Sequence, residues 1–182
     1  NFILENTFAF ETIILRNATA FGYSTNLRLD LVVNDLTFNG YFNKQIKLIS
    51  DGQPKRPIVH IYDISNAIDM IISDERNLDK EIFNIGSNNM NFSIKQIAET
   101  IGNTLNLEDI SFGEFDSDQR SYEVNFDKFT KYFSNFSIRY DLKNGVEHLI
   151  AHLAGYELNG NEKRINSLKE LVSDGKLNSE LF

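Results

Sequence analysis

Short apolar runs alternate with longer amphipathic stretches along the chain. Short runs rich in β-branched residues predict strands at residues 11–15, 46–49, 58–61 and 82–85, the last three bounded by Gly, Pro or Asp signals. The first follows a short helix expected over residues 2–8 and is predicted to be a buried parallel strand. A polar loop is expected over residues 19–26.

Helices are predicted between and after these strands. Apolar residues recur at helical spacing from residue 29 to about residue 42. Ser93 and Gln96 form a capping box ahead of another apolar stripe, and two more amphipathic stretches close the chain. They contain Val146, Leu149, Ile150 and Leu153 in one and Ile165, Leu168, Leu171 and Val172 in the other. The alternation of strand and helix indicates an α/β fold, with one plausible linker at residues 155–161.

Composition narrows the functional classes. The chain has 182 residues, 41% of them hydrophobic, which suits one packed domain or part of a larger one. It has no Cys, which fits a reducing compartment, and no apolar run approaches the length that spans a bilayer, so a cytoplasmic location is expected. The net charge of −8 argues against general binding to nucleic acid or to anionic membranes. An anionic ligand would need a few well-placed cations.

The segment DGQPKRPIVHIYDISNAI, residues 51–68, suggests such a cation. A turn at Asp51 and Gly52 leads to Arg56 at the start of the apolar run, and Asp63 is predicted to cap the next helix. Arg56 would then be a fixed cation at the edge of a strand. Guanidinium groups match phosphate oxygens bidentately, whereas the alternative is a surface salt bridge to one of the nearby carboxylates.

Further segments accompany this one in a recognisable order: LRNATAFG (residues 15–22), RLDLVVN (28–34), EIFNIGS (81–87) and QRSYEVNFDK (119–128). With them the chain resembles the C-terminal half of the NAD-dependent nucleotide-sugar epimerases and dehydratases, in the extended short-chain dehydrogenase/reductase family. The ending KLNSELF, residues 176–182, is similar to the natural terminus of one subgroup. The resemblance implies the last strands of a Rossmann-type parallel sheet plus a small mixed α/β substrate-binding subdomain. Residues 162–182 would be a helical tail.

The resemblance also implies site residues. Arg56 and Arg120 would hold the diphosphate of a nucleoside-diphosphate sugar, and Asn34 would donate its amide to a phosphate. The positions expected to complete the site are Thr19, where the family usually has Asn, Arg28, Ile49 beside the nucleotide base, and Asn17 near the nicotinamide. Tyr122 and Phe126 are each either stacking or core residues. NAD or NADP would be the cofactor, bound mainly by an N-terminal half, and a homodimer is possible.

Two features of these relatives are absent. No GxxGxxG follows a strand, and no Tyr is followed four residues later by Lys, so the chain alone is expected to be inactive, with no catalytic residue of its own. Three hypotheses stay open. The parent protein is an epimerase, a dehydratase or a reductase; or it is a non-catalytic sugar-nucleotide-binding module; or His148 and His152 form a metal site, for which a solvated helix face is the favoured alternative. His60 is expected to be a core histidine.

Overall fold

The computed structural model describes residues 2–114, 120–156 and 164–176. Their regular elements are α1 (Phe2–Glu5), β1 (Ile14–Asn17), β2 (Thr19–Phe21), α2 (Val32–Asn43), β3 (Ile46–Leu48), β4 (Lys55–His60), α3 (Ile61–Ile72), β5 (Ile82–Ile85), the 3-10 turn η1 (Asn88–Met90), β6 (Asn91–Ser93), α4 (Ile94–Leu105), β7 (Ile110–Phe112), α5 (Asp127–Tyr132), α6 (Leu142–Leu153) and α7 (Arg164–Ser173). Strands and helices alternate, so the α/β prediction is confirmed.

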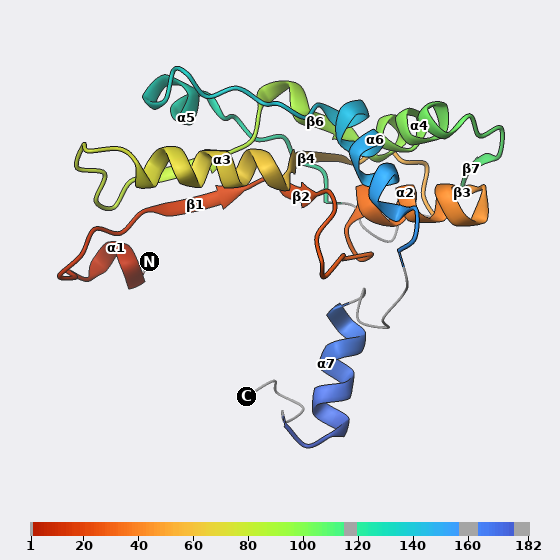
Figure 1. Ribbon diagram of the computed structural model, residues 1–182, viewed down its shortest axis with the longest axis horizontal. Helices are drawn as coiled ribbons and strands as arrows, with labels where there is room; N and C mark the ends of the chain where they lie inside the picture. Colours follow the sequence, from red (N-terminus) through yellow and green to blue (C-terminus); the bar gives the residue numbers. More distant parts are fainter. Residues whose placement is uncertain (1, 115–119, 157–163, 177–182) are drawn as a thin grey trace.

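The strands form three small sheets that follow one another across the molecule (Figure 1). β1 pairs with β5 and β3 pairs with β7, both in parallel. Between them, β4 pairs in parallel with β2 and antiparallel with β6. α3 lies beside β1, whereas α2, α4 and α6 gather beside the other two sheets (Figure 1). α7 lies apart from the other elements, at the place where the last helix was predicted (Figure 1).

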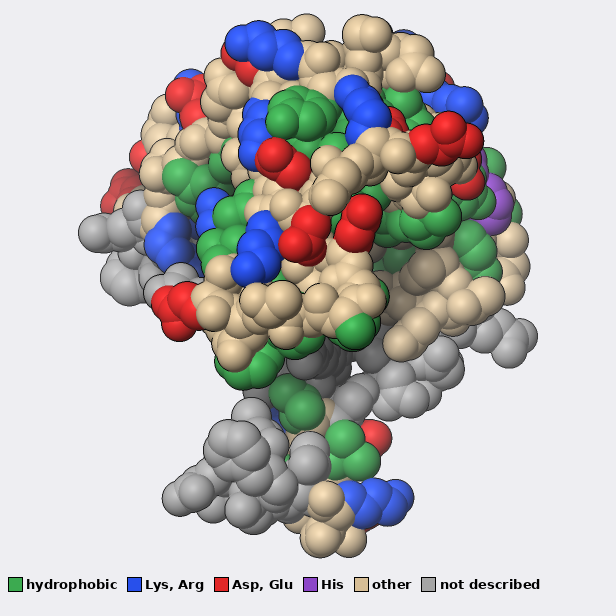
Figure 2. Space-filling model, turned by 90° about the vertical axis from the view of Figure 1, so that its left-hand side faces the viewer, with side chains coloured by type: hydrophobic (Ala, Val, Ile, Leu, Met, Phe, Trp, Pro, Cys, Tyr) green, Lys and Arg blue, Asp and Glu red, His purple; other side chains and the backbone are tan. Residues whose placement is uncertain are grey.

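Two main apolar cores correspond to this arrangement. One joins the helices α2, α4 and α6 to the strands β2, β3 and β4, and its fully buried members include Phe21, Ile46, Ile58 and Ile97. The other packs α3 and α5 against β5, around Phe83 and Phe129. The end of the molecule that carries α1 and α5 shows apolar side chains interspersed with both cations and carboxylates (Figure 2). No helix of the described residues is both long and apolar enough to cross a bilayer.

Local signals predicted some elements correctly. The strand at Ile82–Ile85 has the predicted bounds. The capping box is also confirmed: the Ser93 hydroxyl accepts from the Gln96 N–H, and the Gln96 side chain accepts from the Ser93 N–H. This box starts α4 at Ile94, and the predicted apolar stripe, including Ile97, Ala98 and Ile101, is buried. Each signal spans only four consecutive residues, which is why the sequence alone reveals it.

Several predicted boundaries were wrong because tertiary pairing decides them. The strand expected over residues 11–15 is β1, which begins at Ile14, where the register with β5 begins. Within the loop expected over residues 19–26, Thr19 to Phe21 form β2, because they pair with β4. The helix expected over residues 2–8 ends at Glu5. The strand expected over residues 46–49 ends at Leu48.

Around Arg56 the strand is longer and begins earlier than predicted. β4 covers Lys55–His60, and Ile61 already belongs to α3. The prediction that Asp63 caps α3 was wrong, because the His60 side chain accepts the hydrogen bond from the Tyr62 N–H. Asp63 is instead fully buried, where its carboxylate accepts from the backbone N–H groups of Arg139 and Tyr140. Burial raises the pKa of Asp63, and these two hydrogen bonds oppose that shift.

The helix predicted from residue 29 begins three residues later, at Val32. Leu31 has extended backbone and is the residue before the helix, and Leu29 packs against α6 instead of continuing the apolar face of α2. The three-residue strands β6 and β7 and the short helix α5 were not predicted, since each is too short for a periodic pattern.

Candidate functional site

Arg56 lies near the start of β4, the middle strand of the central sheet. It is the second residue of β4, opposite Phe92 of the antiparallel neighbour β6. Its Nη1 donates to the backbone carbonyl of Lys55 at 2.8 Å and to the backbone carbonyl of Arg120. One guanidinium therefore joins two segments that are 64 residues apart in the sequence.

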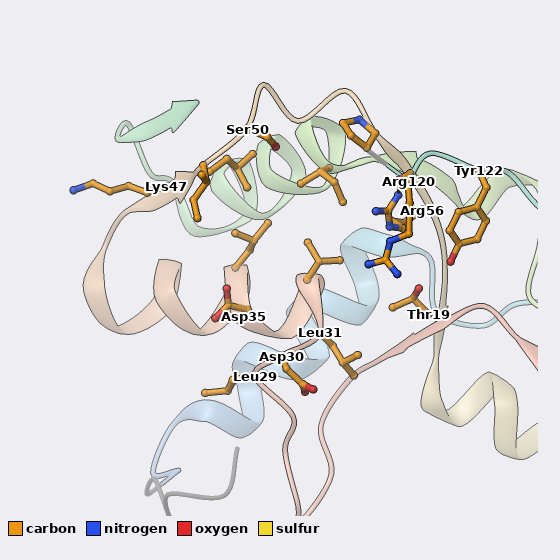
Figure 3. Close-up of a pocket in the computed structure, with 16 residues that line it drawn as sticks. Thr19, Leu29, Asp30, Leu31, Asp35, Lys47, Ser50, Arg56, Arg120 and Tyr122 are labelled. Carbon is orange, nitrogen blue, oxygen red and sulfur yellow. Dashed lines mark hydrogen bonds between the residues drawn. The ribbon is translucent and has the colours of Figure 1, made fainter. Parts of the chain in front are cut away.

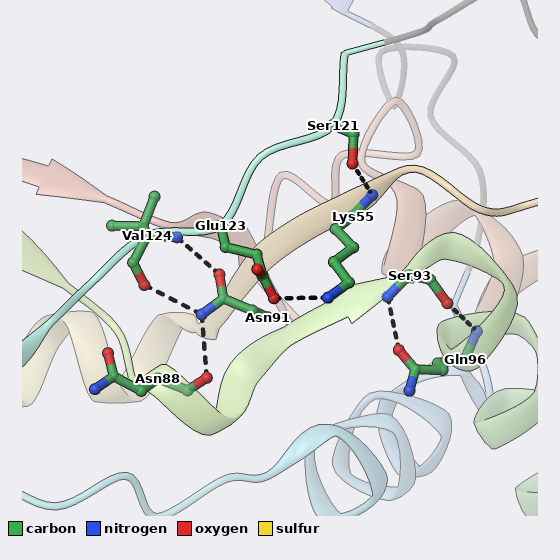
Figure 4. Close-up of polar contacts among 8 residues, drawn as sticks. All are labelled: Lys55, Asn88, Asn91, Ser93, Gln96, Ser121, Glu123 and Val124. Atoms are coloured by element: carbon green, nitrogen blue, oxygen red, sulfur yellow. Dashed lines mark hydrogen bonds and ion pairs between the residues drawn. The ribbon is translucent and has the colours of Figure 1, made fainter.

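The segment after Arg120 runs beside the start of β4 (Figure 4). The Lys55 backbone N–H donates to Ser121 Oγ at 3.0 Å, and Lys55 Nζ forms an ion pair with Glu123 at 2.8 Å. Farther along, the Asn91 side chain of β6 accepts from the Val124 N–H and donates to the Val124 carbonyl (Figure 4). These contacts dock the segment on β4 and β6, which places Arg120 and Tyr122 beside Arg56.

The two arginines border a cavity of about 670 Å³ (Figure 3). One wall is formed by Thr19 at the start of β2 and by residues 29–36 at the start of α2. The others are formed by residues 47–50 at the end of β3 and by Arg56 with the segment at Arg120 and Tyr122. The lining residues are Thr19, Leu29, Asp30, Leu31, Val32, Asp35, Leu36, Lys47, Leu48, Ile49, Ser50, Pro54, Arg56, Ile94, Arg120 and Tyr122. Its volume lies in the range typical of sites for small molecules and cofactors, about 300–1,000 Å³.

Charge is divided between two sides of this cavity. The guanidinium groups of Arg56 and Arg120 lie side by side above Thr19, whereas the carboxylates of Asp30 and Asp35 lie on the side formed by residues 29–36 (Figure 3). Two adjacent cations repel each other, and an anion between them removes that repulsion. α2 also begins at this wall without a side-chain cap, so the positive end of its dipole adds to the potential there.

Thr19, Ile49, Arg56 and Arg120, of the residues predicted for the site, line the cavity together. Thr19 lies on β2, and Ile49, which is 74% exposed, follows β3. Tyr122 also lines it, with its ring 5.5 Å from the Arg56 guanidinium carbon. Tyr122 and Phe126, each expected to be either a stacking or a core residue, differ in position.

Phe126 belongs to the apolar core. Its side chain is 1% exposed and packs with Ala18 and Val59, away from the cavity. Tyr122 is 48% exposed, so it is the aromatic residue that a ligand could reach.

Arg28, Asn34 and Asn17 do not line the cavity. The Arg28 guanidinium forms a two-pronged pair with the Asp30 carboxylate at 2.9 and 2.5 Å, and this carboxylate raises the pKa of Arg28. Asn34 is 3% exposed, and its amide bonds to the backbone of Gly22 and of Arg28. The geometry of this chain therefore gives Asn34 backbone partners where the resemblance implies a phosphate. Asn17 ends β1 on an exposed position.

Sequence reasoning missed Asp30 and Asp35. Both lie inside or next to the RLDLVVN segment that drew attention to Asn34, and both line the cavity. On a helix, successive residues point about 100° apart, so Asp35 can face a cavity while Asn34 faces the protein interior. The signal that could have found Asp35 is its polar side chain beside the apolar Val32, Val33 and Leu36.

The three histidines, His60 at the end of β4 and His148 and His152 on α6, form a cluster separate from the cavity. The prediction of a core histidine is confirmed for His60, which is fully buried and stacks on Tyr140 with ring centroids 4.1 Å apart. Burial, together with a smaller effect of the nearby His148, lowers the pKa of His60 to about 4.

His148 was expected on a solvated helix face, and that expectation was wrong. Its ring packs against His60, Tyr62 and Tyr140, with its Nδ1 buried. The next histidine on α6, His152, is exposed, and its Nδ1 lies 2.8 Å from the His148 carbonyl oxygen. In the described part of the chain, no group of three or more His, Cys, Asp or Glu could hold a metal ion.

For a dinucleotide the described residues offer only part of a site. A pyrophosphate needs a glycine-rich loop between a strand and a helix, and the sequence contains no GxxGxxG. The carboxyl end of β1, with Asn17 and Ala18, is a place where the nicotinamide end could approach, because ligands of open α/β sheets bind at the carboxyl ends of strands. The sequence therefore lacks the loop that the diphosphate of a dinucleotide requires.

Part of the chain matches a family of known proteins. Residues 3–86 match the model of the NAD dependent epimerase/dehydratase family. The match covers the elements from α1 to β5, and so includes Thr19, Ile49 and Arg56. Arg120 and Tyr122 lie outside it, so their assignment to the site depends on the cavity.

Solved structures show the same fold. An NAD complex of dTDP-glucose 4,6-dehydratase from Bacillus anthracis has a TM-score of 0.65 at 21% identity, covering 84% of this chain and 46% of that one. For UDP-glucuronic acid 4-epimerase from Bacillus cereus, with UDP-glucuronic acid and NAD, the values are 0.66 and 19%, covering 78% and 45%. For ADP-L-glycero-D-manno-heptose-6-epimerase from Helicobacter pylori they are 0.68 and 17%, covering 85% and 48%. The chain thus spans about half the length of these proteins.

Proposed function

We propose that the cavity binds a nucleoside-diphosphate sugar and that the chain is the substrate-binding part of an NAD-dependent epimerase or dehydratase. The observation that carries this proposal is the convergence of Arg56 and Arg120 on one cavity from distant parts of the sequence. A diphosphate linkage carries about two negative charges, and planar guanidinium groups bind phosphate oxygens in pairs. The family match and the sugar nucleotide in the Bacillus cereus structure support the same ligand class.

The remaining walls suit the rest of such a ligand. Lys47, Leu48, Ile49 and Ser50 at the end of β3 form a mixed polar and apolar wall, where we place the nucleotide base. Thr19, the first residue of β2, lies next to the arginine pair, where we place the diphosphate and the start of the sugar. Binding energy from the base and the diphosphate would then hold the sugar in a fixed orientation for reaction.

Catalysis in this proposal requires residues that the 182-residue chain does not contain. The cofactor supplies hydride transfer, and a Tyr with Lys four residues later would move the protons. Neither that pair nor the glycine-rich loop occurs in the sequence, so we propose that NAD or NADP is held mainly by another part of the protein. The 182 residues alone should therefore show no NAD-dependent turnover, and measurable turnover would contradict this division of roles.

A non-catalytic sugar-nucleotide-binding module is the second candidate. Such a module would use the same cavity and would need neither a glycine-rich loop nor a Tyr and Lys pair. The two candidates share the cavity and its ligand. They differ in one measurement, the conversion of a bound sugar nucleotide to product by the intact protein in the presence of NAD.

Calorimetric titration with UDP-, dTDP-, CDP- and GDP-sugars tests the shared binding proposal. At least one should bind, and Arg56→Ala or Arg120→Ala should each weaken that binding about 10- to 100-fold, as expected for the loss of a charge-assisted hydrogen bond. Arg139→Ala is the matched control, because Arg139 is exposed and does not line the cavity. Failure of every sugar nucleotide to bind, or equal affinity in all three variants, would refute the proposal.

A further inference from the structure

Asn34 connects two backbone positions in the segment between β2 and α2. Its Oδ1 accepts from the Gly22 N–H at 3.0 Å, and its Nδ2 donates to the Arg28 carbonyl at 3.1 Å. The side chain is 3% exposed and does not line the cavity. One amide on α2 therefore holds both ends of the loop between Gly22 and Arg28.

Each end of this loop leads directly to cavity residues. Gly22 follows β2, whose first residue, Thr19, lines the cavity. Gly22 has a φ of +116°, and a Cβ there would lie 2.6 Å from His60 Nε2, so the chain is closely confined at this point. Arg28 precedes Leu29, Asp30 and Leu31, which form part of the opposite wall.

The loop has a second attachment, but it acts on a different side. Leu27 and Leu29 are buried against Leu149 and Leu153 of α6. Apolar packing holds the loop against α6 without direction, whereas the two hydrogen bonds of Asn34 fix the backbone separation of Gly22 and Arg28. The position of the wall relative to β2 thus depends on Asn34.

We propose that Asn34 is a positioning residue that sets the width of the cavity between Thr19 and the wall formed by residues 29–31, without touching the ligand. The identity of the ligand rests on the proposed function, but the clamp itself does not. Asn34→Ala removes both hydrogen bonds. Asn34→Asp keeps an acceptor for the Gly22 N–H and replaces the donor to the Arg28 carbonyl by a second oxygen, so it opens only one end.

Hydrogen exchange measured by NMR tests the clamp. The Gly22 amide of the unmodified protein should exchange slowly, Asn34→Ala should accelerate it about tenfold or more, and Asn34→Asp should leave it nearly unchanged. Asn43→Ala is the matched control: Asn43 is the exposed last residue of α2, and its amide bonds only to Asn39. Rapid exchange of Gly22 in the unmodified protein overturns the clamp even if no variant folds.

Titration with UDP and with inorganic pyrophosphate tests the positioning role. Both Asn34 variants should weaken UDP binding about tenfold while changing pyrophosphate binding less than about twofold, because pyrophosphate needs only the arginine pair. General loss of stability would not separate the two ligands in this way. Equal loss for both ligands would show that Asn34 contacts phosphate and would overturn the inference, as would unchanged UDP affinity. If the unmodified protein binds neither ligand, the proposed function fails, whereas Gly22 exchange still decides whether the clamp exists.

Discussion

The two ends of β4 place basic side chains in opposite environments. Arg56, near the start of the strand, borders the open cavity with Arg120 and Tyr122. His60, at the end of the same strand, is fully buried in a group of aromatic rings, and its pKa is lowered to about 4. Arg56 therefore lies where a ligand could reach it, whereas His60 is neutral near pH 7 and caps α3 through Nδ1.

This difference separates binding from stability along a single strand. Water and a ligand can reach the arginine end, so changes there should alter affinity and leave folding nearly intact. The histidine end has no such access, so changes there should cost folding free energy and leave the affinity of the folded protein unchanged. Substitutions at each end of β4 can test this separation.

Asp63→Ala should give the largest loss of stability. The fully buried Asp63 carboxylate accepts from the N–H groups of Arg139 and Tyr140, and its removal leaves both donors without that partner. We expect the free energy of unfolding to fall by about 2–5 kcal/mol. Urea denaturation measures this change, and Asp63→Asn, which keeps one acceptor oxygen, should lie between. A loss below about 1 kcal/mol would contradict the assigned role.

The second prediction concerns the pH dependence of stability. The folded pKa of His60, about 4, lies below its ordinary value of 6.5, so the unfolded chain takes up a proton that the folded chain does not. Stability from this group is fully present above pH 6.5 and is lost as the pH falls toward 4. The total is roughly 3 kcal/mol. His148, whose pKa burial also lowers, adds a loss of the same sign.

His60→Asn provides the control for this titration. An Asn can still cap α3 but binds no proton in this range, so the fall in unfolding free energy between these two pH values should become shallower. The remaining slope would come from His148 and other groups. Equal slopes in the two proteins, measured by urea denaturation at several pH values, would show that His60 is not the group responsible.

The sequence predicted the arginine end of β4 better than the histidine end. A turn followed by an apolar run places Arg56 at a strand edge, and that signal is local. The cap of α3 was assigned to Asp63 because Asp is a favourable capping residue, but β4 ends at His60, one residue earlier than predicted, and His60 itself occupies the capping position. Only the pairing of β4 with β2 shows where the strand ends.

Only some of the residues that line the cavity were predicted, because the path of one loop depends on contacts distant in sequence. Motif resemblance indicated Thr19, Ile49, Arg56 and Arg120, and the structure brings these residues together. It also indicated Asn34, whose side chain turns inward because the loop between Gly22 and Arg28 folds back onto α2. That loop has no periodic pattern, so its path, and with it the exposure of Asp30 and Asp35, depends on contacts distant in sequence.

The smallest expected effect is at Tyr122, at the arginine end. Its ring lies 5.5 Å from the Arg56 guanidinium carbon and is 48% exposed, so the cation–π contact should contribute only about 0.5–1 kcal/mol. Tyr122→Leu should therefore weaken sugar-nucleotide binding about two- to fivefold in calorimetry, without changing stability measurably. Tyr122→Phe keeps the ring and should bind like the unmodified protein. If Phe weakens binding as much as Leu does, the hydroxyl and not the ring contacts the ligand. If Leu instead reduces stability, the arginine end also carries folding free energy, and the separation between the two ends of β4 does not hold.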